Sequence, residues 1–360
     1  MSTSAAPAHM DAAPPLERGA CVISIDTELA WGEAHRRDGT EGRHRFAAER
    51  GVIAELLAVL ARYEISATWA VVGHLFLDAC RDDGRGPHPE LVPPTYEWLD
   101  ADWLAIDPCS SLDADPFWYG RDIVDAILAC PVRQEIGSHS FTHVIVDDPA
   151  CTPEVFSSEL SAATTVAADR GVELRSFVYP RNAIAQIPLL ARHGFRCYRG
   201  GRTSEPFAGR PPWLRRGLQA LDRLRPLRGS AVMPQRHPSG VWNVPQTYLF
   251  APPTGGRRLP PRVWSRRAVT RLRQAVRHRS LFHLWFHPYN ITADPEWALA
   301  ALEHVCREAA RRRDAADLAV VTMGELAASL DGPDVTPRAT ASENSSEQLD
   351  VPEAEGPTLR

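Results

Sequence analysis

The chain has 360 residues, 44% of them hydrophobic, and its 40 basic and 45 acidic residues give a formal net charge of −5. This length is enough to bury a full core, because about 250 residues suffice for one α/β barrel. All 40 basic residues are arginine. The composition therefore excludes the classes of protein whose chemistry needs a lysine ammonium: Schiff-base and pyridoxal phosphate enzymes, Walker A nucleotide-binding proteins and protein kinases.

Seven cysteines occur without a Cys-x-x-Cys pair, so the sequence indicates neither a disulfide framework nor a thiolate zinc site. The N-terminal residues contain no continuous apolar segment after a basic start, and no run approaches the roughly 20 apolar residues of a membrane span. We therefore expect a cytoplasmic protein.

The two ends of the chain differ in composition from its centre. Residues 1–18 are rich in Ala, Pro and Ser, and residues 331–360 are acidic and polar with few large apolar groups. Both compositions predict disordered tails. We expect residues 19–330 to form a single catalytic domain.

Strand-like and helix-like segments alternate between the tails, as is typical of a βα-repeating fold. Short β-branched apolar runs predict strands at residues 22–25, 65–72, 175–179, 195–198, 281–286 and 318–322. Apolar residues at helical spacing predict helices at residues 52–63, 121–129, 153–169, 187–193 and 295–313. The alternation indicates an α/β fold with a parallel sheet.

A first insertion interrupts this alternation at residues 81–119, which are rich in Pro, Asp and aromatic residues. Loops that follow strands build the active face of α/β barrels. Its aromatic side chains either stack on sugar rings or anchor the loop in a small core of its own, and the sequence does not decide between the two.

A second insertion, at residues 200–280, is strongly basic. Residues 210–279 contain sixteen arginines and a single acid, Asp222. Within them, residues 213–227 and 264–277 place Leu, Val and Trp on one helical face and Arg on the other. Such a segment is typical of a contact with a membrane surface, a nucleotide or a phosphate, or of a solvated arginine face packed against the barrel.

Two histidines and two acids stand out as candidate site residues. His139 and His143 are four apart, so one helical turn would let them share a metal ion. Asp26 and Glu28 follow the apolar run at residues 22–25, and residues two apart at a strand end point to the same side. One acid can therefore complete a metal site while the other stays available as a base. Without a carboxylate, the histidine pair would simply be two solvated side chains on a helix face.

Five short segments, in order, resemble the motifs of the polysaccharide deacetylase family, which is carbohydrate esterase family four: residues 24–32, 67–73, 135–143, 176–182 and 286–288. The resemblance extends from about residue 20 to residue 330. It implies a distorted (β/α) barrel with fewer than eight units and a divalent metal, usually zinc, that serves to remove N-acetyl or O-acetyl groups from sugars.

The resemblance also implies roles for individual residues. His139 and His143 would ligate the metal with Glu28, and Asp26 would be the base, as in relatives whose first motif reads Asp-x-Glu; the inverse assignment, with Asp26 on the metal, stays open. His287 corresponds to the general acid, with His283 as a second candidate on the same strand face. Arg181 lies near the arginine that pairs with the catalytic acid, although here it follows Pro180 instead of preceding it. The backbone N–H groups of residues 181 and 182 would contact the oxyanion.

The function implied is deacetylation of a carbohydrate, and the basic segment at residues 210–279 suggests an amino sugar linked to an anionic nucleotide or lipid carrier, with the protein peripheral at the inner membrane face. One alternative is a non-sugar amide hydrolase of the same fold. The other is a catalytically inactive barrel that binds anionic lipid or nucleic acid. The complete set of two acids, two histidines and a late histidine argues against lost catalysis, so nucleic acid is not an expected partner.

Overall fold

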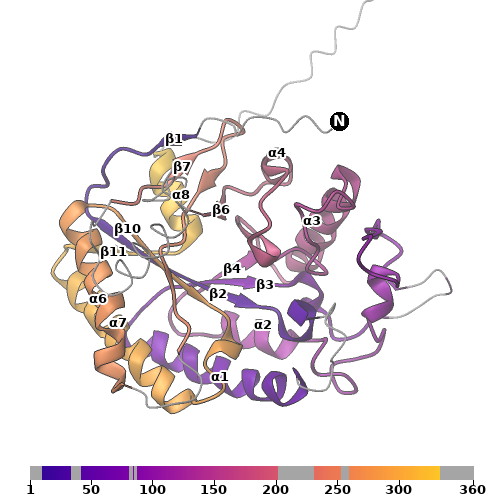
Figure 1. Ribbon diagram of the computed structural model, residues 1–360, viewed down its shortest axis with the longest axis horizontal. Helices are drawn as coiled ribbons and strands as arrows, with labels where there is room; N and C mark the ends of the chain where they lie inside the picture. The colour runs from indigo at the N-terminus through magenta and orange to yellow at the C-terminus, as the bar shows by residue number, and fades with distance from the viewer. Residues whose placement is uncertain are drawn as a thin grey trace, which may run out of the picture.

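The computed structural model describes residues 10–33, 42–80, 84, 87–201, 231–252 and 259–332. Its strands form one 11-stranded sheet in the order β1-β7-β8-β6-β5-β4-β3-β2-β10-β9, with β11 paired to β2. The sheet curls into an incomplete barrel (Figure 1). The strand bounds are β1 (Asp11–Ala12), β2 (Gly19–Thr27), β3 (Thr68–Val71), β4 (Glu135–Ser138), β5 (Ser176–Val178), β6 (Cys197–Arg199), β7 (Gln235–Arg236), β8 (Trp242–Asn243), β9 (Tyr248–Leu249), β10 (Leu281–Phe286) and β11 (Leu318–Val320).

Helices cover the outer face of this sheet, as Figure 1 shows for α1, α2, α6 and α7. The described helices are α1 (Gly42–Arg62), α2 (Arg121–Leu128), α3 (Pro153–Ala168), α4 (Ile187–Arg192), α6 (Pro261–His278), α7 (Pro295–Asp314) and α8 (Met323–Asp331). Short 3-10 helices follow three of the strands at η2 (Gly73–Phe76), η4 (Pro180–Asn182) and η5 (Pro288–Asn290). The main core lies between the helices and the sheet.

The central strand β2 separates two apolar clusters because its side chains alternate between the two faces of the sheet. Cys21, Ile23 and Ile25 join the core under the helices, whereas Ala20 and Val22 join a smaller cluster inside the curl. Ser24 and Asp26 have the same parity as the inner pair, which places them inside the barrel. β2 pairs in parallel with β3, β10 and β11, so the carboxyl ends of β2, β3 and β10 meet at one edge.

The opposite end of the barrel is closed by α8. Thr322 begins this helix with a capping box to Glu325, a device that stabilises a helix start by about 1 kcal/mol. Glu135 of β4 accepts hydrogen bonds from the Gly324 backbone N–H (3.1 Å) and from the Thr68 hydroxyl (2.6 Å). The half-buried carboxylate is thus satisfied by the start of α8 and by the neighbouring strand β3.

Some elements differ from the sequence-based expectations. Residues 11–12 lie in the segment predicted to be a disordered tail, but they form β1, because their backbone pairs antiparallel with β7. The second insertion also contributes to the barrel, since β7, β8 and β9 are short strands of the sheet and α6 covers it. The helix expected at residues 264–277 is part of α6, whereas the one expected at residues 213–227 lies outside the described residues.

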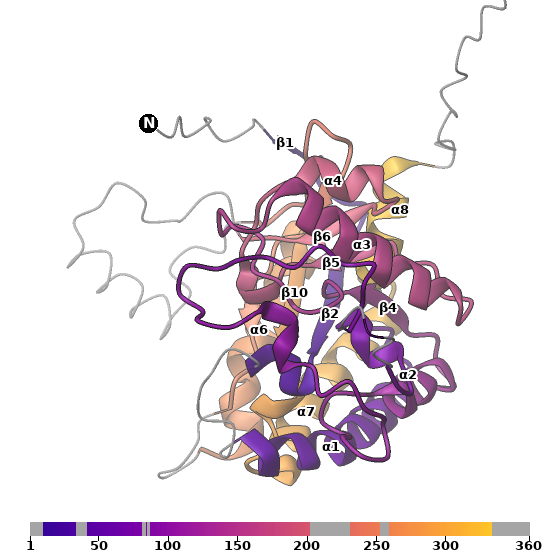
Figure 2. The ribbon, with the colours of Figure 1, turned by 90° about the vertical axis from the view of Figure 1, so that its right-hand side faces the viewer.

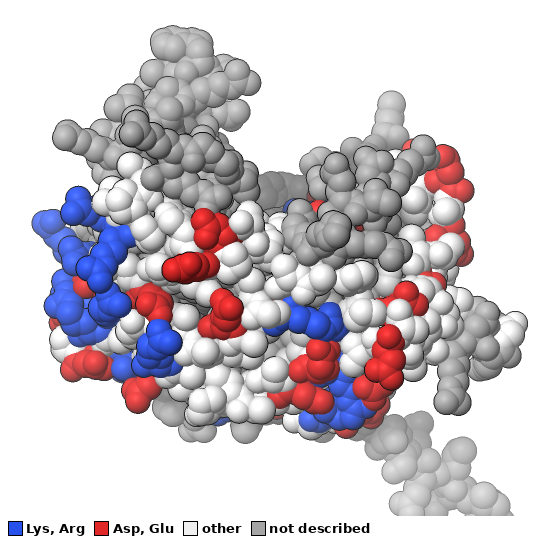
Figure 3. All heavy atoms as spheres, turned by 90° about the horizontal axis from the view of Figure 1, so that it is seen from below, with Lys and Arg blue, Asp and Glu red and all other residues white. Residues whose placement is uncertain are grey.

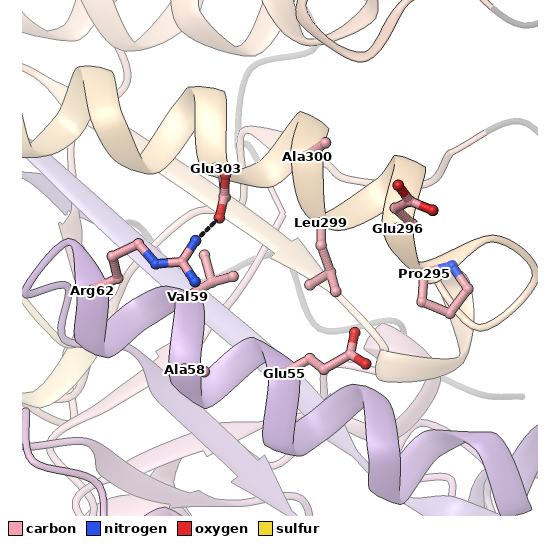
Figure 4. Close-up of a pocket in the computed structure, with 9 residues that line it drawn as sticks. All are labelled: Glu55, Ala58, Val59, Arg62, Pro295, Glu296, Leu299, Ala300 and Glu303. Atoms are coloured by element: carbon pink, nitrogen blue, oxygen red, sulfur yellow. Dashed lines mark hydrogen bonds and ion pairs between the residues drawn. The ribbon is translucent and has the colours of Figure 1, made fainter.

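Helices α1 and α7 pack side by side (Figures 1 and 2). An open groove lies between them on the outer surface. Figure 4 shows that Arg62 of α1 pairs with Glu303 of α7 across it, above the apolar side chains of Val59 and Leu299. None of the candidate site residues lines this groove. Among the described helices, none has both the length and the apolar character that crossing a membrane requires.

Candidate metal centre

Three side chains with metal-binding atoms meet where β2 and β4 end. Glu28 directly follows β2, and His139 and His143 lie in the loop after β4. The Oε2 atom of Glu28 lies 3.2 Å from Nε2 of His139 and 2.9 Å from Nε2 of His143. All three residues are buried, and their ligand atoms lie within 4.8 Å of one another. The structure therefore brings together the three residues that the sequence analysis assigns to a metal.

The two histidines are held by an irregular loop, so the expectation that they share one helical turn is wrong. Ser140 and His143 have φ angles of +58° and +64°, in the left-handed region that non-glycine residues rarely adopt. Glu159 of α3 shapes the loop, since its Oε2 accepts hydrogen bonds from the backbone N–H groups of Phe141 (2.8 Å) and Thr142 (2.7 Å). This backbone geometry, sparsely populated elsewhere, is what turns both imidazoles toward the carboxylate.

The hydrogen bonds of the two imidazoles leave acceptor atoms facing the carboxylate. His139 Nδ1 lies 2.8 Å from the carbonyl oxygen of Val178. A carbonyl only accepts, so Nδ1 carries the proton, and Nε2 of the neutral ring presents a lone pair to Glu28. Nδ1 of His143 is buried and has no hydrogen-bond partner, whereas Nε2 faces Oε2 of Glu28 at 2.9 Å. A cation between Oε2 of Glu28 and the Nε2 atoms of the two histidines would bind all three atoms, so the residues present fit a divalent metal.

The surroundings favour the protonation states that bind a metal. Burial acts to raise the pKa of Glu28, but the imidazoles of His287 and His143 outweigh it and hold that pKa well below its ordinary value. Burial also lowers the pKa of His143. Both directions favour the forms that ligate a metal, which are an ionised carboxylate and a neutral imidazole.

Gly32 leaves the space that the Glu28 side chain occupies. It lies in the 3-10 helix η1 (Leu29–Glu33) directly after Glu28. A Cβ atom at this position would lie 2.2 Å from Oε1 of Glu28, far inside van der Waals contact. Only glycine is compatible with this carboxylate position.

Asp26 is fixed by a two-pronged ion pair with Arg199, the last residue of β6. Its Oδ1 and Oδ2 atoms lie 2.5 Å and 2.6 Å from the guanidinium NH1 and NH2 groups, and both side chains are buried. Burial acts to raise the pKa of Asp26, but the charges of Arg199 and His287 outweigh it and lower that pKa. Asp26 is therefore ionised at neutral pH.

This pair corrects the role expected for Arg181. From the sequence we expect Arg181 to lie near the catalytic acid and pair with it, but it is Arg199 that pairs with Asp26. Arg181 lies in η4 after β5, with φ of +54°, and its charge is near enough to His143 to help lower the pKa of that residue. The N–H group of Asn182 donates to the carbonyl of Tyr179 (2.9 Å), so it is already engaged and does not serve as the expected oxyanion donor.

His287 stands at the opening of the site. It follows β10, its side chain is 18% exposed, and Nε2 lies 3.5 Å from both Oδ2 of Asp26 and Oε1 of Glu28. The ring stacks on Tyr289 with 4.5 Å between centroids. Asn290 holds the backbone, because its Oδ1 accepts from the N–H group of His287 (2.9 Å). This imidazole is the one among the site histidines that both faces solvent and borders the two acids.

His283, the second candidate for the acid, lies deeper in the barrel. Its Nε2 lies 2.8 Å from the hydroxyl of Ser24, and its Nδ1 lies 3.1 Å from the carbonyl oxygen of Val244. Burial and the charge of Arg199 lower its pKa to about 3. A fully buried imidazole that stays neutral is a structural group, which leaves His287 as the candidate acid.

The chain folds as a curled α/β barrel with a carboxylate and two imidazoles at the carboxyl ends of its strands. The chain is similar to a structure from Mycobacterium smegmatis whose description assigns it provisionally to the polysaccharide deacetylases: the TM-score is 0.56, the identity is 15%, and the match covers 96% of this chain and 100% of the other. The predicted fold, a distorted barrel resembling this family, is thereby confirmed.

Weaker similarities exist to enzymes of two kinds. A family 4 carbohydrate esterase from Streptomyces lividans aligns with a TM-score of 0.34 and 12% identity, over 84% of this chain and 91% of the other. A GH57-type branching enzyme from Pyrococcus horikoshii aligns with a TM-score of 0.48 and 10% identity, over 88% and 71%. No family model matches the sequence, and no curated protein does.

Proposed function

We propose that this protein is a metal-dependent hydrolase that removes an acetyl group from a carbohydrate. The observation that carries the proposal is the convergence of Nε2 of His139 and Nε2 of His143 on Oε2 of Glu28, at 3.2 Å and 2.9 Å; with neutral rings these atoms are ligands for a shared cation. The barrel, shared with a structure described as a polysaccharide deacetylase, supports the class of reaction.

Glu28, His139 and His143 would hold the cation, and zinc suits a set of one carboxylate and two imidazoles. When bound, the cation supplies Lewis acidity to a water molecule and to the acyl oxygen. Val178 orients His139 through the hydrogen bond to Nδ1, and Glu159 fixes the loop that carries His143. Such supporting contacts hold ligands in a productive geometry.

Asp26 and His287 divide the proton transfers. Asp26 is ionised, so it accepts the proton of the attacking water as general base. Its low pKa makes it a weak base, which is effective only toward a water that is already acidified. His287 borders both acids and the solvent, and in its protonated form it would donate to the leaving amine or alcohol. Arg199 keeps Asp26 charged and in place.

Aromatic and basic groups beside the centre support a carbohydrate substrate on an anionic carrier. Trp98 of the first insertion is 44% exposed and stacks on Tyr96 with 4.8 Å between centroids, while the Arg181 guanidinium lies 5.9 Å from the Trp98 ring. A sugar ring stacks on such a surface. Figure 3 shows arginines gathered along the left edge of that view, on the side where α6 and α7 lie in Figure 1.

The test is acetate release by purified protein. The protein is stripped with a chelator, reloaded with Zn²⁺, Co²⁺ or Mg²⁺, and incubated with N-acetylated and O-acetylated oligosaccharides. We expect release only from the reloaded protein, and loss of both metal and activity in His143→Ala. His278→Ala, which removes an exposed imidazole of α6, is the matched control and should behave as wild type. Full activity of the stripped protein would overturn the proposal, and hydrolysis of simple N-acyl amides with no action on any sugar would favour the non-sugar amide hydrolase.

The nature of the carrier is tested separately. Free N-acetylglucosamine is compared with the same sugar linked to a nucleotide diphosphate and to a lipid diphosphate, at low and high salt. A preference for the lipid form together with liposome binding would support a protein that is cytoplasmic and peripheral at the inner membrane face. Equal, salt-insensitive rates for all three would refute the anionic carrier.

A further inference from the structure

A second cluster of metal-binding atoms joins the first insertion to the residues just before it, apart from the centre described above. Its members are His74 of η2 and three residues of the loop that follows: Cys80, His88 and Asp107. One ligand atom from each lies within 4.8 Å of all the others. His74, His88 and Asp107 are buried, and Cys80 is half-buried.

The carboxylate oxygen Oδ2 of Asp107 is the common point of the cluster. It lies 3.1 Å from Nε2 of His74, 2.9 Å from Nε2 of His88 and 3.6 Å from Sγ of Cys80. Zinc with ligands at about 2.0 to 2.3 Å in a tetrahedron holds its ligand atoms roughly 3.3 to 3.8 Å apart. The three distances from Oδ2 lie within about 0.5 Å of this range, and the remaining pairs of ligand atoms lie within 4.8 Å of each other.

Each ligand is also oriented by a contact to a second group. His74 Nδ1 lies 3.0 Å from the carbonyl oxygen of Trp118, and His88 Nδ1 lies 3.3 Å from a carboxylate oxygen of Glu90. Cys80 Sγ lies 3.1 Å from the hydroxyl of Tyr119, and Oδ1 of Asp107 accepts from the backbone N–H of Cys109 (2.9 Å). Carboxylates and carbonyls behind the imidazoles are the usual support of metal-bound histidines.

The contact between His74 and Asp107 favours a cation between them. Because Nδ1 of His74 donates to a carbonyl, its Nε2 presents a lone pair toward Oδ2 of Asp107 when the ring is neutral. Two acceptors then face each other inside the protein. A divalent ion would satisfy both atoms and the thiolate of Cys80 together.

We propose that His74, Cys80, His88 and Asp107 bind a structural zinc ion that fastens the first insertion to the loop of the catalytic metal. All four positions are filled by protein atoms, as in structural zinc sites. The backbone connects the two regions: the N–H groups of Gly73 and His74 donate to the carbonyls of Ser140 (2.8 Å) and Phe141 (3.0 Å). The ring of Phe141 also packs edge-on against His88, with 5.1 Å between centroids.

The experiment counts metal in the purified full chain by elemental analysis. Wild type should hold two zinc ions per chain, whereas Cys80→Ser and His88→Ala should each hold one. His143→Ala should also hold one, from the other site. Cys130→Ser, which removes another half-buried cysteine, is the matched control and should hold two. Equal metal content in wild type, Cys80→Ser and His88→Ala would overturn the proposal.

Cobalt distinguishes the two sites without an activity assay. The first centre contains no thiolate, so a thiolate-to-cobalt charge-transfer band in the reloaded protein reports only the second. The band should persist in His143→Ala and vanish in Cys80→Ser. Cys109 lies beside Cys80, so Cys109→Ser and a count of free thiols after unfolding are included. A disulfide between these two cysteines in wild type, with no cobalt band, would refute the site. Seven free thiols in wild type, together with an intact cobalt band in Cys109→Ser, would support it.

Discussion

Asp26 and Glu28 are two residues apart on the same face of a strand end, yet their surroundings give them different chemistry. Asp26 receives a guanidinium on both oxygens, whereas Glu28 receives two imidazole nitrogens on one oxygen. Because Arg199 occupies both oxygens of Asp26, that carboxylate has few lone pairs left to bind a metal. The Glu28 carboxylate instead faces imidazole nitrogens, and a cation between them would stabilise the contact. The geometry thus favours Glu28 as the ligand and Asp26 as the base, over the inverse assignment.

The two acids should therefore separate by phenotype. Glu28→Gln should lower the affinity for zinc, because the amide lacks the charge that a ligand supplies. Asp26→Asn should keep the metal but lower the turnover number by about 100- to 10,000-fold, as expected for loss of a general base. It should also lower stability by about 3 kcal/mol, since Arg199 stays buried without its counter-charge.

Paired metal titrations, turnover measurements and thermal unfolding check this expectation. The turnover of Asp26→Asn is measured well below its unfolding temperature. If Asp26→Asn lost the metal and Glu28→Gln kept it, the inverse assignment would be established.

Gly32 should control the position of the metal ligand without a role in folding. Gly32→Ala places a methyl group where Oε1 of Glu28 lies. The Glu28 side chain can rotate more easily than the backbone of η1 can shift, so the carboxylate should move. We expect zinc affinity to fall about 10- to 100-fold, as when a supporting contact of a metal ligand is lost. The measurement is competition for zinc with a chromophoric chelator.

Gly51→Ala is the matched control for this substitution. Gly51 lies in α1 with open space around its missing Cβ, so alanine should leave metal affinity unchanged and raise helix stability by about 1 kcal/mol. Equal zinc affinities in Gly32→Ala and wild type would show that Glu28 does not ligate the metal in this position.

At the residue scale, the sequence could predict what depends on spacing and strand parity. Asp26, Glu28 and the histidine pair lie close together as expected. Arg199 could not be predicted, because it pairs with Asp26 across 173 positions and belongs to no motif. The cluster around Asp107 was missed for the same reason: its four members have no characteristic spacing, and only the path of the loop brings them together.

At the scale of elements, the packing of the arginine-rich helices α6 and α7 depends on one carboxylate, that of Glu308. Glu308 of α7 accepts from Arg273 of α6 (2.9 Å) and from Arg311 (2.8 Å) and Arg312 (3.1 Å) of its own helix. Burial acts to raise the pKa of Glu308, but these arginines outweigh it and lower that pKa to about 2. The carboxylate therefore stabilises the packing of the two helices.

This stabilisation should depend on pH. The folded-state pKa of Glu308 lies below the ordinary value of 4.5, so its contribution is complete above about pH 4.5 and is lost as the pH falls toward 2. Glu308→Gln should lower the free energy of unfolding by about 1 kcal/mol at pH 7, and the difference from wild type should shrink below pH 4.5. Urea unfolding at several pH values measures it.

Glu55→Gln, at an exposed acid of α1, is the control and should differ little from wild type at any pH. A difference between Glu308→Gln and wild type that stayed constant from pH 7 to pH 3 would show that the arginine contacts do not depend on the charge of Glu308.

Helices and strands were predicted correctly where the segment has its own hydrophobic periodicity. They were missed where pairing with a neighbouring strand determines the backbone conformation. The strand at residues 281–286 and the helix at residues 264–277 carry clear periodicity, and both form. The two-residue strands β1, β7, β8 and β9 have no periodicity to detect, since their backbone is extended only because a neighbouring strand is there. The spacing of His139 and His143 is compatible with either a helix or a loop. The hydrogen bonds that Glu159 accepts from the backbone stabilise the loop.

At the scale of the whole molecule, parallel topology collects the candidate site at one edge. β2, β4, β6 and β10 bring Asp26, His139, Arg199 and His287 to their carboxyl ends, although the residues are spread over most of the chain. The alternation of strands and helices predicts this meeting in general, because parallel strands present the same ends to one edge. It cannot predict which arginine arrives there, since that depends on the strand order.

The basic surface of α6 has a defined relation to this edge. Residues 279–280 alone join α6 to β10, so the helix runs antiparallel to the strand and its first turns lie at the site edge. Ring contacts agree with this direction, because Phe250 packs against both Trp264 of α6 (5.1 Å) and Phe286 at the end of β10 (5.6 Å). Arginines near the start of α6 are therefore nearer to the site than those at its end.

Arginines at the two ends of α6 should accordingly differ in their effect on KM for a carrier-bound substrate. Arg262→Ala combined with Arg266→Ala removes two exposed charges from the first turns, whereas Arg277→Ala removes one from the last turn. The double variant should raise KM for a diphosphate-linked N-acetyl sugar roughly 3- to 30-fold at low salt, with exposed ionic contacts worth up to about 1 kcal/mol each, and high salt should shrink the effect. Arg277→Ala should leave KM unchanged, and both variants should hydrolyse the free sugar like wild type. If the two ends had the same effect, or if the free sugar were affected equally, the α6 arginines would serve only the packing and solubility of the helix.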